Sequence, residues 1–185
     1  MITGTKIRLR ALERSDLPKI CQWLNDEEVM YYDSGHPGNT ASLAEVEHWL
    51  DEELERRPLD RKDYIIETLD GVAIGRIDYK GLSVKHRDAE LGIHIGEKDY
   101  WEKGYGTDAI MTFLNYLFNE LQLHRVWLGT ASYNTRAQRC YEKCGFVKEG
   151  VSRERRFVNG KYYDSINMAI VRHEFNQQVS ERDER

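Results

Sequence analysis

Residues 88–107 read DAELGIHIGEKDYWEKGYGT, and this stretch carries the strongest structural signal in the chain. In its first half Ala89, Leu91, Ile93 and Ile95 are apolar, and Glu90, Gly92, His94 and Gly96 follow them in alternation. Such alternation predicts a strand over 88–95 with one face in a core. Because glycines leave room beside a strand, the second face is expected to line a cleft that holds a ligand.

The second half of this stretch, residues 101–107, lies between the predicted strand and a long helix predicted over 104–121. Gly104 and Gly106 allow successive backbone N–H groups to point toward one spot, where the N-terminus of the helix adds positive potential. These residues form a candidate phosphate-binding loop, although a tight turn alone would also explain the two glycines. The loop matches neither the G-x-x-x-x-G-K-S/T nor the G-x-G-x-x-G pattern.

A third group of residues, 134–146, reads NTRAQRCYEKCGF. It predicts a short helix with Asn134 as its N-cap and Gly145 just beyond its end, where these residue types are favoured. Taken one by one, these residues have structural explanations, and packing alone would explain Tyr141. A strand predicted over 125–130 separates this helix from the long one.

The rest of the chain completes one mixed α/β domain. Hydrophobic periodicity predicts further strands over 6–12, 63–69, 72–79, 146–157 and 161–170, a helix capped by Ser15, and a helix over 42–57. The pairs Asp70-Gly71 and Asn159-Gly160 predict tight turns between strands. We expect a loop over 33–40, one domain over 1–175 and a charged tail over 176–185, with helices packed on a single sheet.

Composition and charge limit the classes of protein. The 185 residues suit one domain, and contents of 40% hydrophobic and 11% aromatic residues exclude a disordered chain. The net charge of −5 argues against nonspecific binding of nucleic acid, which depends on neutralising phosphates. The longest uncharged apolar run, 109–119, is too short for a membrane span, and the first residues contain no signal-peptide pattern.

The three cysteines are Cys21, Cys140 and Cys144, with no C-x-x-C pair among them. An odd number cannot pair fully within one chain, and no nearby Cys or His completes a four-ligand zinc site around Cys140 and Cys144. We therefore expect no metal, buried thiols and a reducing cytoplasm. Neither Cys140 nor Cys144 is expected to act as a nucleophile, since no His lies nearby in the sequence to activate it.

Three of these segments resemble one family. Residues 101–107 resemble the Q/R-x-x-G-x-G/A motif of the GNAT superfamily of acyl-CoA N-acyltransferases, and residues 134–146 resemble its N-x-x-A-x-x-x-Y-x-K-x-G-F motif. Residues 89–92 resemble the strand before its pyrophosphate loop. Segments 7–12, 16–17 and 23–26 extend the similarity to the Rim-type protein N-terminal acetyltransferases and the related spermidine acetyltransferases. Trp101 departs from the motif, in which Gln or Arg is usual.

The resemblance implies a GNAT fold, a single central, mostly antiparallel sheet flanked by helices, with acetyl-CoA as co-substrate. It implies that the backbone of Ile93, His94 and Ile95 pairs with pantetheine. The pyrophosphate would be held by amides of Trp101, Glu102, Lys103, Gly104, Tyr105, Gly106 and Thr107. In the second motif Asn134, Ala137 and Tyr141 would lie along the cofactor, and Lys143, with Arg136 and Arg139, would approach its nucleotide end.

The same resemblance implies an N-acetyltransferase that moves the acetyl group directly to a primary amine. Glu90, directly or through a water, is the candidate base, although an ion pair with Arg76 or Arg87 would also explain it. Tyr141 would protonate the departing thiolate, and a backbone N–H of the strand over 88–96 would stabilise the oxyanion. The alternative is a non-catalytic acetyl-CoA-binding module on the same fold.

The acceptor is expected to be a cationic amine. Between Asp26 and Asp60, eleven carboxylates face only Arg56 and Arg57, which gives this segment a net charge of −9. An acidic rim would concentrate a cation, whereas a solvated helix face would also explain the charges. Polyamine, aminoglycoside and protein N-terminus are left open. The basic stretch over 148–161 is interpreted as a solvated surface or a homodimer contact rather than a nucleic-acid site.

Overall fold

A computed structural model describes the chain except residues 35–37, 39, 57 and 184–185, and of residues 181–183 it describes the backbone alone. Eight strands form one sheet in the order β1-β2-β3-β4-β5-β6-β8-β7. They are β1 (Ile2–Thr3), β2 (Ile7–Ala11), β3 (Lys62–Thr68), β4 (Ala73–Ser83), β5 (Asp88–Ile95), β6 (Arg125–Ala131), β7 (Val147–Val158) and β8 (Lys161–Val171). Neighbours run antiparallel except β5 and β6, which are parallel. The predicted mixed α/β, mostly antiparallel fold is confirmed.

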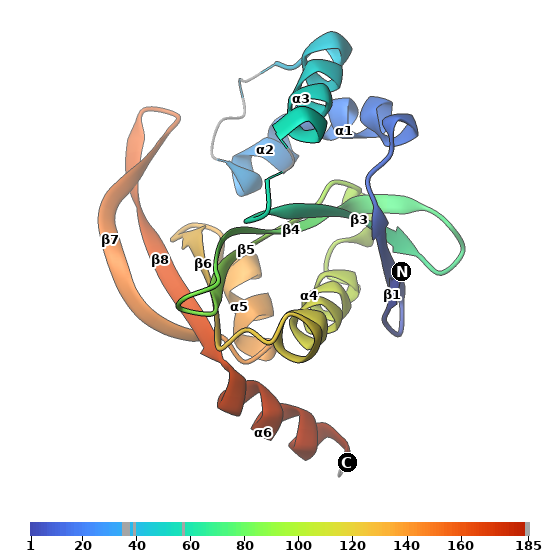
Figure 1. The fold of residues 1–185 in the computed structure, drawn as a ribbon. Coiled ribbons are helices and arrows are strands. Elements are labelled where there is room, and N and C mark those ends of the chain that lie inside the picture. The colour runs from blue at the N-terminus through green and yellow to red at the C-terminus, as the bar shows by residue number, and fades with distance from the viewer. Residues whose placement is uncertain (35–37, 39, 57, 184–185) are drawn as a thin grey trace.

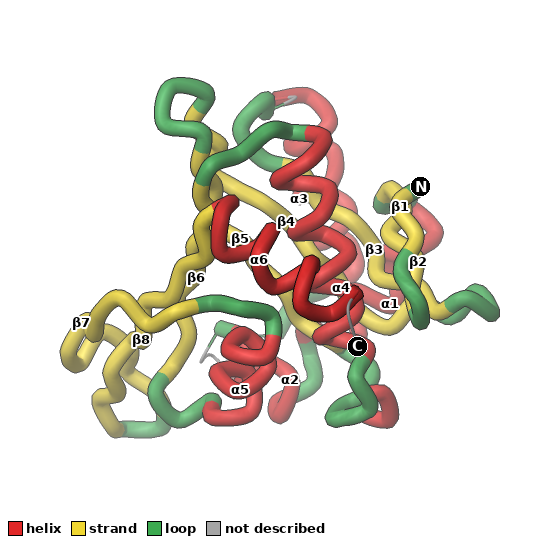
Figure 2. Tube along the Cα trace, turned by 90° about the horizontal axis from the view of Figure 1, so that it is seen from below, coloured by secondary structure: helices red, strands yellow, loops and turns green. Residues whose placement is uncertain are grey.

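The helices lie in two groups on opposite sides of the sheet (Figures 1 and 2). The first group is α1 (Leu17–Leu24), α2 (Glu27–Asp33) and α3 (Leu43–Arg56), and the second is α4 (Tyr105–Asn115), α5 (Thr135–Lys143) and α6 (Arg172–Asp183). Each group buries its own apolar cluster. Phe113 and Phe118 belong to the larger cluster on the α4 side, and Ile20 and Trp23 belong to the smaller one under α1 and α3.

The parallel strands β5 and β6 pair over only three positions, from Asp88 opposite Arg125 to Glu90 opposite Trp127. Beyond Glu90 the two strands diverge, while β5 stays paired with β4 and β6 with β8. Among the described residues, the edge of β5 that faces β6 therefore has no partner strand after Glu90, and its outward backbone groups are left for another partner. This divergence creates the main opening of the sheet.

Both predicted turns are confirmed. In the turn between β3 and β4, Gly71 has a φ of 92° and its N–H donates to the carbonyl of Thr68 at 3.0 Å. In the turn between β7 and β8, Asn159 and Gly160 have φ values of 48° and 76°. Asn and Gly tolerate this left-handed backbone, which explains the Asn-Gly signal.

Several local predictions were wrong. Ser15 does not cap the first helix: Arg14–Asp16 form a 3₁₀ turn whose N-cap is Glu13, because the Asp16 carboxylate accepts from the Glu13 N–H at 2.9 Å. The helix predicted over 104–121 changes to a π-helix over Tyr116–Glu120, and this wider turn keeps Leu117 and Phe118 fully buried. The short elements β1 and α2 had no clear sequence signal. Asp33, placed in a loop over 33–40, ends α2, and residues 35–37 and 39 lie outside the described residues.

Residues 176–183, predicted as part of a charged tail, continue helix α6. Its Phe175 is 2% exposed, with a ring centroid 5.0 Å from that of Phe118. The Arg172 guanidinium donates at 2.7 Å to the carbonyl of Phe118, in the π-helix over Tyr116–Glu120, where terminal carbonyls lack helical partners. It also donates at 2.8 Å to the carbonyl of Leu123, just beyond that helix. These contacts order the segment, because they give the helix an apolar and a polar anchor on the core.

Candidate active site

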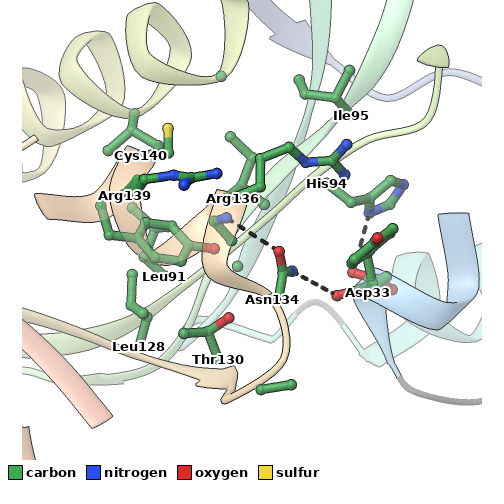
Figure 3. A pocket seen from close by; sticks show the side chains of 18 of the residues that line it. Asp33, Leu91, His94, Ile95, Leu128, Thr130, Asn134, Arg136, Arg139 and Cys140 are labelled. Carbon is green, nitrogen blue, oxygen red and sulfur yellow. Dashed lines mark hydrogen bonds and ion pairs between the residues drawn. The ribbon is translucent and has the colours of Figure 1, made fainter. Parts of the chain in front are cut away.

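A cavity of about 660 Å³ opens where β5 and β6 diverge. Its walls come from the free edge of β5, the loop over 101–107, helix α5, strand β6 and the end of α2. Figure 3 shows side chains from these elements converging on one space, with Asn134 and Asp33 facing each other across it. Segments far apart in the sequence therefore build one site.

Most of the predicted binding residues line this cavity. They are Ile93, His94, Ile95, Trp101, Glu102, Gly104, Gly106, Thr107, Asn134, Ala137, Tyr141 and Lys143, together with the candidate base Glu90. Lys103 and Tyr105 do not line it. The Tyr105 ring instead packs edge-on against Tyr100, with the Lys6 ammonium 5.4 Å from its centroid.

The loop over 101–107 has the properties of an anion site. Gly104 is the N-cap of α4 with a φ of 86°, a conformation that favours glycine. Among the described residues, the N–H groups of Tyr105, Gly106 and Thr107 have no hydrogen-bond acceptor. A Cβ on Gly106 would meet only Cys140 Sγ and a side-chain carbon of Ile95, both at 3.9 Å, so packing within the protein does not require this glycine. The backbone N–H groups of this loop are therefore open to a ligand.

Trp101, the residue that departs from the motif, is held on both sides. Its indole N–H donates to the carbonyl of Ile95 at 2.7 Å, and the Arg136 guanidinium lies 3.7 Å from its ring centroid. The same guanidinium lies 4.8 Å from the ring of Tyr32. The Ile95 carbonyl, expected to pair with pantetheine, is thus already occupied. Sequence reasoning missed this stack, although the unusual Trp101 was its signal.

Asn134 is the N-cap of α5, as predicted: its side-chain oxygen accepts from the Ala137 N–H at 3.1 Å. Its Nδ2 donates to the Tyr32 carbonyl at 3.1 Å (Figure 3). Nearby, the Tyr133 hydroxyl donates to the Tyr31 carbonyl at 2.8 Å. The end of α2 is therefore fixed across the cavity. Within the described part of the chain, the second amide hydrogen of Asn134 has no acceptor, so it can donate to a ligand. Sequence reasoning missed Tyr32, because α2 itself was not predicted.

Tyr141 is partly buried beside the main core, and its ring centroid lies 5.8 Å from that of Phe146. Burial, followed by the nearby Cys140, raises the pKa of the Tyr141 hydroxyl above its ordinary value. The hydroxyl is therefore protonated at neutral pH. It makes no hydrogen bond within the part of the chain that the structure describes. Its proton is available to a bound ligand.

The two polar side chains of β5 differ in their surroundings. The Glu90 carboxylate forms an ion pair with Lys80 Nζ at 3.2 Å, rather than with Arg76 or Arg87. Burial lowers the pKa of His94, so its ring is neutral at pH 7, and its Nδ1 lies 3.8 Å from Asp33 Oδ1. Glu90 is thus accessible but paired.

Cys140 lies between the cavity and the loop, with its Sγ 3.3 Å from Thr107 Oγ1. A hydrogen bond with Cys144 lowers the pKa of the Cys140 thiol to about 7. None of Cys21, Cys140 and Cys144 forms a disulfide in the described part of the chain. Among the described residues, no group of three or more His, Cys, Asp or Glu side chains is arranged to hold a metal ion. Nor does any described helix combine the length and apolar character needed to cross a membrane.

Several carboxylates of the acidic segment are paired with basic groups. Asp26 and Glu28 both contact Lys98 Nζ, at 2.8 and 3.4 Å, and Glu53 contacts Arg61 at 3.4 Å. Of the eleven carboxylates, only Asp33 lines the cavity. Of the acidic rim expected from this segment, Asp33 alone reaches the cavity, which Glu90 of β5 also lines.

A sheet opened by diverging strands beside free helix N-terminal amides defines an α/β protein with a cleft for an elongated, phosphate-bearing ligand. Comparison with known proteins gives the family: the acetyltransferase (GNAT) domain matches residues 6–147. The chain belongs to the GNAT family of acetyl-CoA-dependent N-acetyltransferases. Acetyl-CoA is its co-substrate, as the resemblance implied.

Individual relatives match most of the chain. Spermidine N(1)-acetyltransferase of Vibrio cholerae is 32% identical over 172 residues, which are 93% of this chain and 96% of that protein. A crystal structure of spermidine N-acetyltransferase from Vibrio cholerae, in complex with CoA and spermine, has a TM-score of 0.84 at 31% identity and covers 94% of this chain and 99% of that chain. A putative ribosomal N-acetyltransferase of Bacillus subtilis is 33% identical over 106 residues, 57% of each protein. The predicted similarity to spermidine and ribosomal types is confirmed.

Proposed function

We propose that this enzyme acetylates a primary amine of an aliphatic polyamine. The observation that carries the proposal is a pair of carboxylates, Asp33 and Glu90, that reach the cavity beside the free edge of β5. Carboxylates along a groove attract a flexible polycation and orient it. Relatives named for spermidine acetylation match more than nine-tenths of the chain, which supports this acceptor. A protein N-terminus is the second candidate, supported by the ribosomal-type relative over 57% of the chain.

Bound acetyl-CoA would supply the activated acetyl thioester. The free amides of Tyr105, Gly106 and Thr107 suit its pyrophosphate, since they lie at a helix N-terminus. Arg139 and Lys143, which also line the cavity, suit its nucleotide end. The unpaired edge of β5 suits its pantetheine arm, although only the backbone before Ile95 is free to pair with it.

Tyr141 is the proposed general acid. Its protonated hydroxyl, without a partner among the described residues, can donate to the sulfur that leaves the acetyl group. Glu90 was predicted as the base from the sequence. As a base it must first release Lys80, so an incoming ammonium group competes with this lysine for the carboxylate. This exchange suits a role for Glu90 in binding the cation.

The proposal is tested by measuring thiol release from acetyl-CoA with spermidine, an aminoglycoside, free amino acids and peptides. We expect spermidine to give the highest kcat/KM. Tyr141→Phe should lower kcat by about 10²-fold or more. Tyr162→Phe, at a residue 64% exposed on the distal hairpin, is the matched control and should leave kcat unchanged. If no amine gives thiol release although acetyl-CoA stabilises the protein against unfolding, the non-catalytic acetyl-CoA-binding module is favoured.

The proposal includes self-association through the β7–β8 hairpin. β7 is the last strand of the sheet, and Val147, Val151 and Phe157 on it are 54%, 42% and 56% exposed. An edge strand with exposed apolar side chains readily pairs with a second copy. Light scattering should give twice the mass of one chain, and Val151→Lys should give a monomer. A monomeric wild type would contradict this part of the proposal.

A further inference from the structure

A further carboxylate lies beside the cavity-lining Gly92, on the neighbouring strand β4. Asp78 of β4 is opposite Gly92 of β5 in the sheet register. Its carboxylate fills the space that a Cβ on Gly92 would occupy. Gly92 lines the cavity, so the missing side chain allows Asp78 to reach over β5 toward it. Asp78 was not singled out from the sequence.

The position of Asp78 matches the point where β5 and β6 separate. The last paired residue of β5 is Glu90, and Gly92 lies two residues further along the diverging part. Ile77, next to Asp78, points into the main core, so Asp78 points to the opposite face of the sheet. Tyr141 packs against that main core and lines the same cavity. Asp78 and Tyr141 thus approach the opening from opposite faces.

Asp78 differs from its acidic neighbours in lacking a partner. Among the described residues, its carboxylate forms no hydrogen bond or ion pair. Glu90 is paired with Lys80, and Asp63 is paired with Arg76 and Arg61. Burial, and then the negative charge of Asp63, raise the pKa of Asp78 to about 6. A carboxylate with such a pKa is ionised at neutral pH, yet it is more basic than an exposed Asp.

We propose that Asp78 is the group that takes the proton from the acceptor ammonium before attack. The inference rests on the amine acetylation proposed above and assigns the base for it. The ammonium transfers one proton to an Asp78 oxygen, which leaves a lone pair on the nitrogen. This nitrogen forms the new bond to the acetyl carbon while the carbon–sulfur bond breaks and Tyr141 protonates the sulfur. The second amine proton restores the Tyr141 hydroxyl through solvent, and Asp78 releases its proton to solvent.

The charged groups around Asp78 support this division of roles. From β3 it faces Asp63 and the nearby Arg61, and from β4 it lies between Arg76 and Lys80. On β5 the flanking polar side chains are Glu90 and His94, and His94 is neutral at pH 7. Asp63 disfavours the charged form of Asp78, while the three cations favour it. Glu90 already binds one ammonium group, that of Lys80, and in the proposed division it holds the substrate cation. Asp78, which has no such partner among the described residues, accepts the proton.

The test compares Asp78→Asn with Glu90→Gln in the full chain. Asparagine keeps the size of Asp78 and cannot accept a proton in this range. With spermidine, we expect Asp78→Asn to lower kcat by about 10²-fold or more, with the KM for acetyl-CoA unchanged. The wild-type kcat should fall below a pH of about 6, and this acid limb should be absent in Asp78→Asn. Glu90→Gln should retain the limb and mainly raise the KM for spermidine.

A second pair of measurements separates catalysis from a structural role. An amine that is neutral at the assay pH needs no base, so the loss in Asp78→Asn should shrink with a weakly basic amine. Gly92→Ala leaves the acid in place but displaces its carboxylate, and it should lower kcat similarly. An Asp78→Asn enzyme with a wild-type acid limb, or a loss equal for all amines, would overturn the assignment. Inactivity of the wild type toward every amine would instead refute the proposed function.

Discussion

The Arg136 guanidinium stacks 3.7 Å from the ring centroid of Trp101, while the Trp101 indole N–H donates to the Ile95 carbonyl at 2.7 Å. One stack therefore ties helix α5 to the loop over 101–107 and to the end of β5. In the family motif the position of Trp101 is usually Gln or Arg. Here α5 supplies the cation and the loop supplies the aromatic ring. Positive charge therefore stays beside the loop over 101–107, although Trp101 replaces the usual Gln or Arg.

Arg136→Ala is expected to weaken binding of CoA. The cation–π contact holds the loop over 101–107 in place by about 0.5–2 kcal/mol. Without it, CoA binding must itself order the loop, so the Kd should rise by up to about 30-fold. Isothermal titration with CoA measures the change, and Arg153→Ala on the exposed hairpin is the matched control. A cycle with Trp101→Leu should show coupling between the two residues. Purely additive effects would show that the stack does not contribute to binding.

Cys140 is expected to be the most reactive thiol of the chain. Its pKa of about 7, lowered by the hydrogen bond with Cys144, makes about half of it thiolate at pH 7. Alkylation of Cys140 should therefore speed up as the pH rises through about 7, and CoA should protect it, because its side chain lines the cavity. Mass spectrometry of labelled peptides, with the buried Cys144 as internal control, measures both effects. Equal labelling with and without CoA would contradict the placement.

Local signals in the sequence were sufficient for the strand β5, the Asn134 cap and the Gly71 turn, since each depends on residues close together in the chain. Contacts set by strand register were not predictable in this way. The pairing of β4 with β5 makes Lys80 the partner of Glu90 and places Asp78 opposite Gly92. The alternation of residues within one strand does not reveal this register. Phe175 was missed for a related reason: a single buried aromatic in a polar helix leaves no periodic pattern.

Phe175→Ala is expected to destabilise the domain. The side chain is 2% exposed against Phe118, and truncation of a buried Phe costs about 3–5 kcal/mol. Urea unfolding measures the free energy of unfolding. Leu59→Ala, at a residue 91% exposed, is the control for an apolar truncation at the surface and should change it by less than about 0.5 kcal/mol. A small effect of Phe175→Ala would mean that α6 is only loosely docked.

The ion pairs of Arg10 should protect the fold against acid. Arg10 binds Asp16 at 2.7 Å and Glu67 at 2.6 Å, and both carboxylates are buried. Burial opposes their charge, but the hydrogen bonds from Arg10 outweigh it and lower the pKa of both acids. Their contribution is therefore present above about pH 4, the range of an unfolded chain, and is lost as the pH falls through the lower folded values.

Arg10→Met should accordingly cost about 3–5 kcal/mol at neutral pH, because it leaves two buried carboxylates without this partner. The difference from wild type should shrink as the pH falls below about 4. Urea unfolding at several pH values checks both statements. Arg14→Met, which removes an exposed pair with Asp51, should cost less than about 1 kcal/mol at any pH. A difference that persists undiminished in acid would mean that Arg10 acts by packing rather than by charge.

Asp78 should have the opposite effect on stability, since an unpaired carboxylate kept for proton transfer costs folding energy when it is charged. Its pKa of about 6 lies above the unfolded value of about 3.9, so the folded state holds the proton more tightly. The contribution of Asp78 to stability is therefore most favourable below about pH 4, and it becomes unfavourable as the pH rises through about 6. Asp78→Asn removes this charge, so the variant should be about 1–3 kcal/mol more stable than wild type at pH values well above 6 and equally stable near pH 4.

Asp63→Asn, which breaks the pair with Arg76, should instead lose stability at neutral pH. Urea unfolding of both variants measures this without any substrate, and a less stable Asp78→Asn at high pH would show that Asp78 is a paired structural carboxylate.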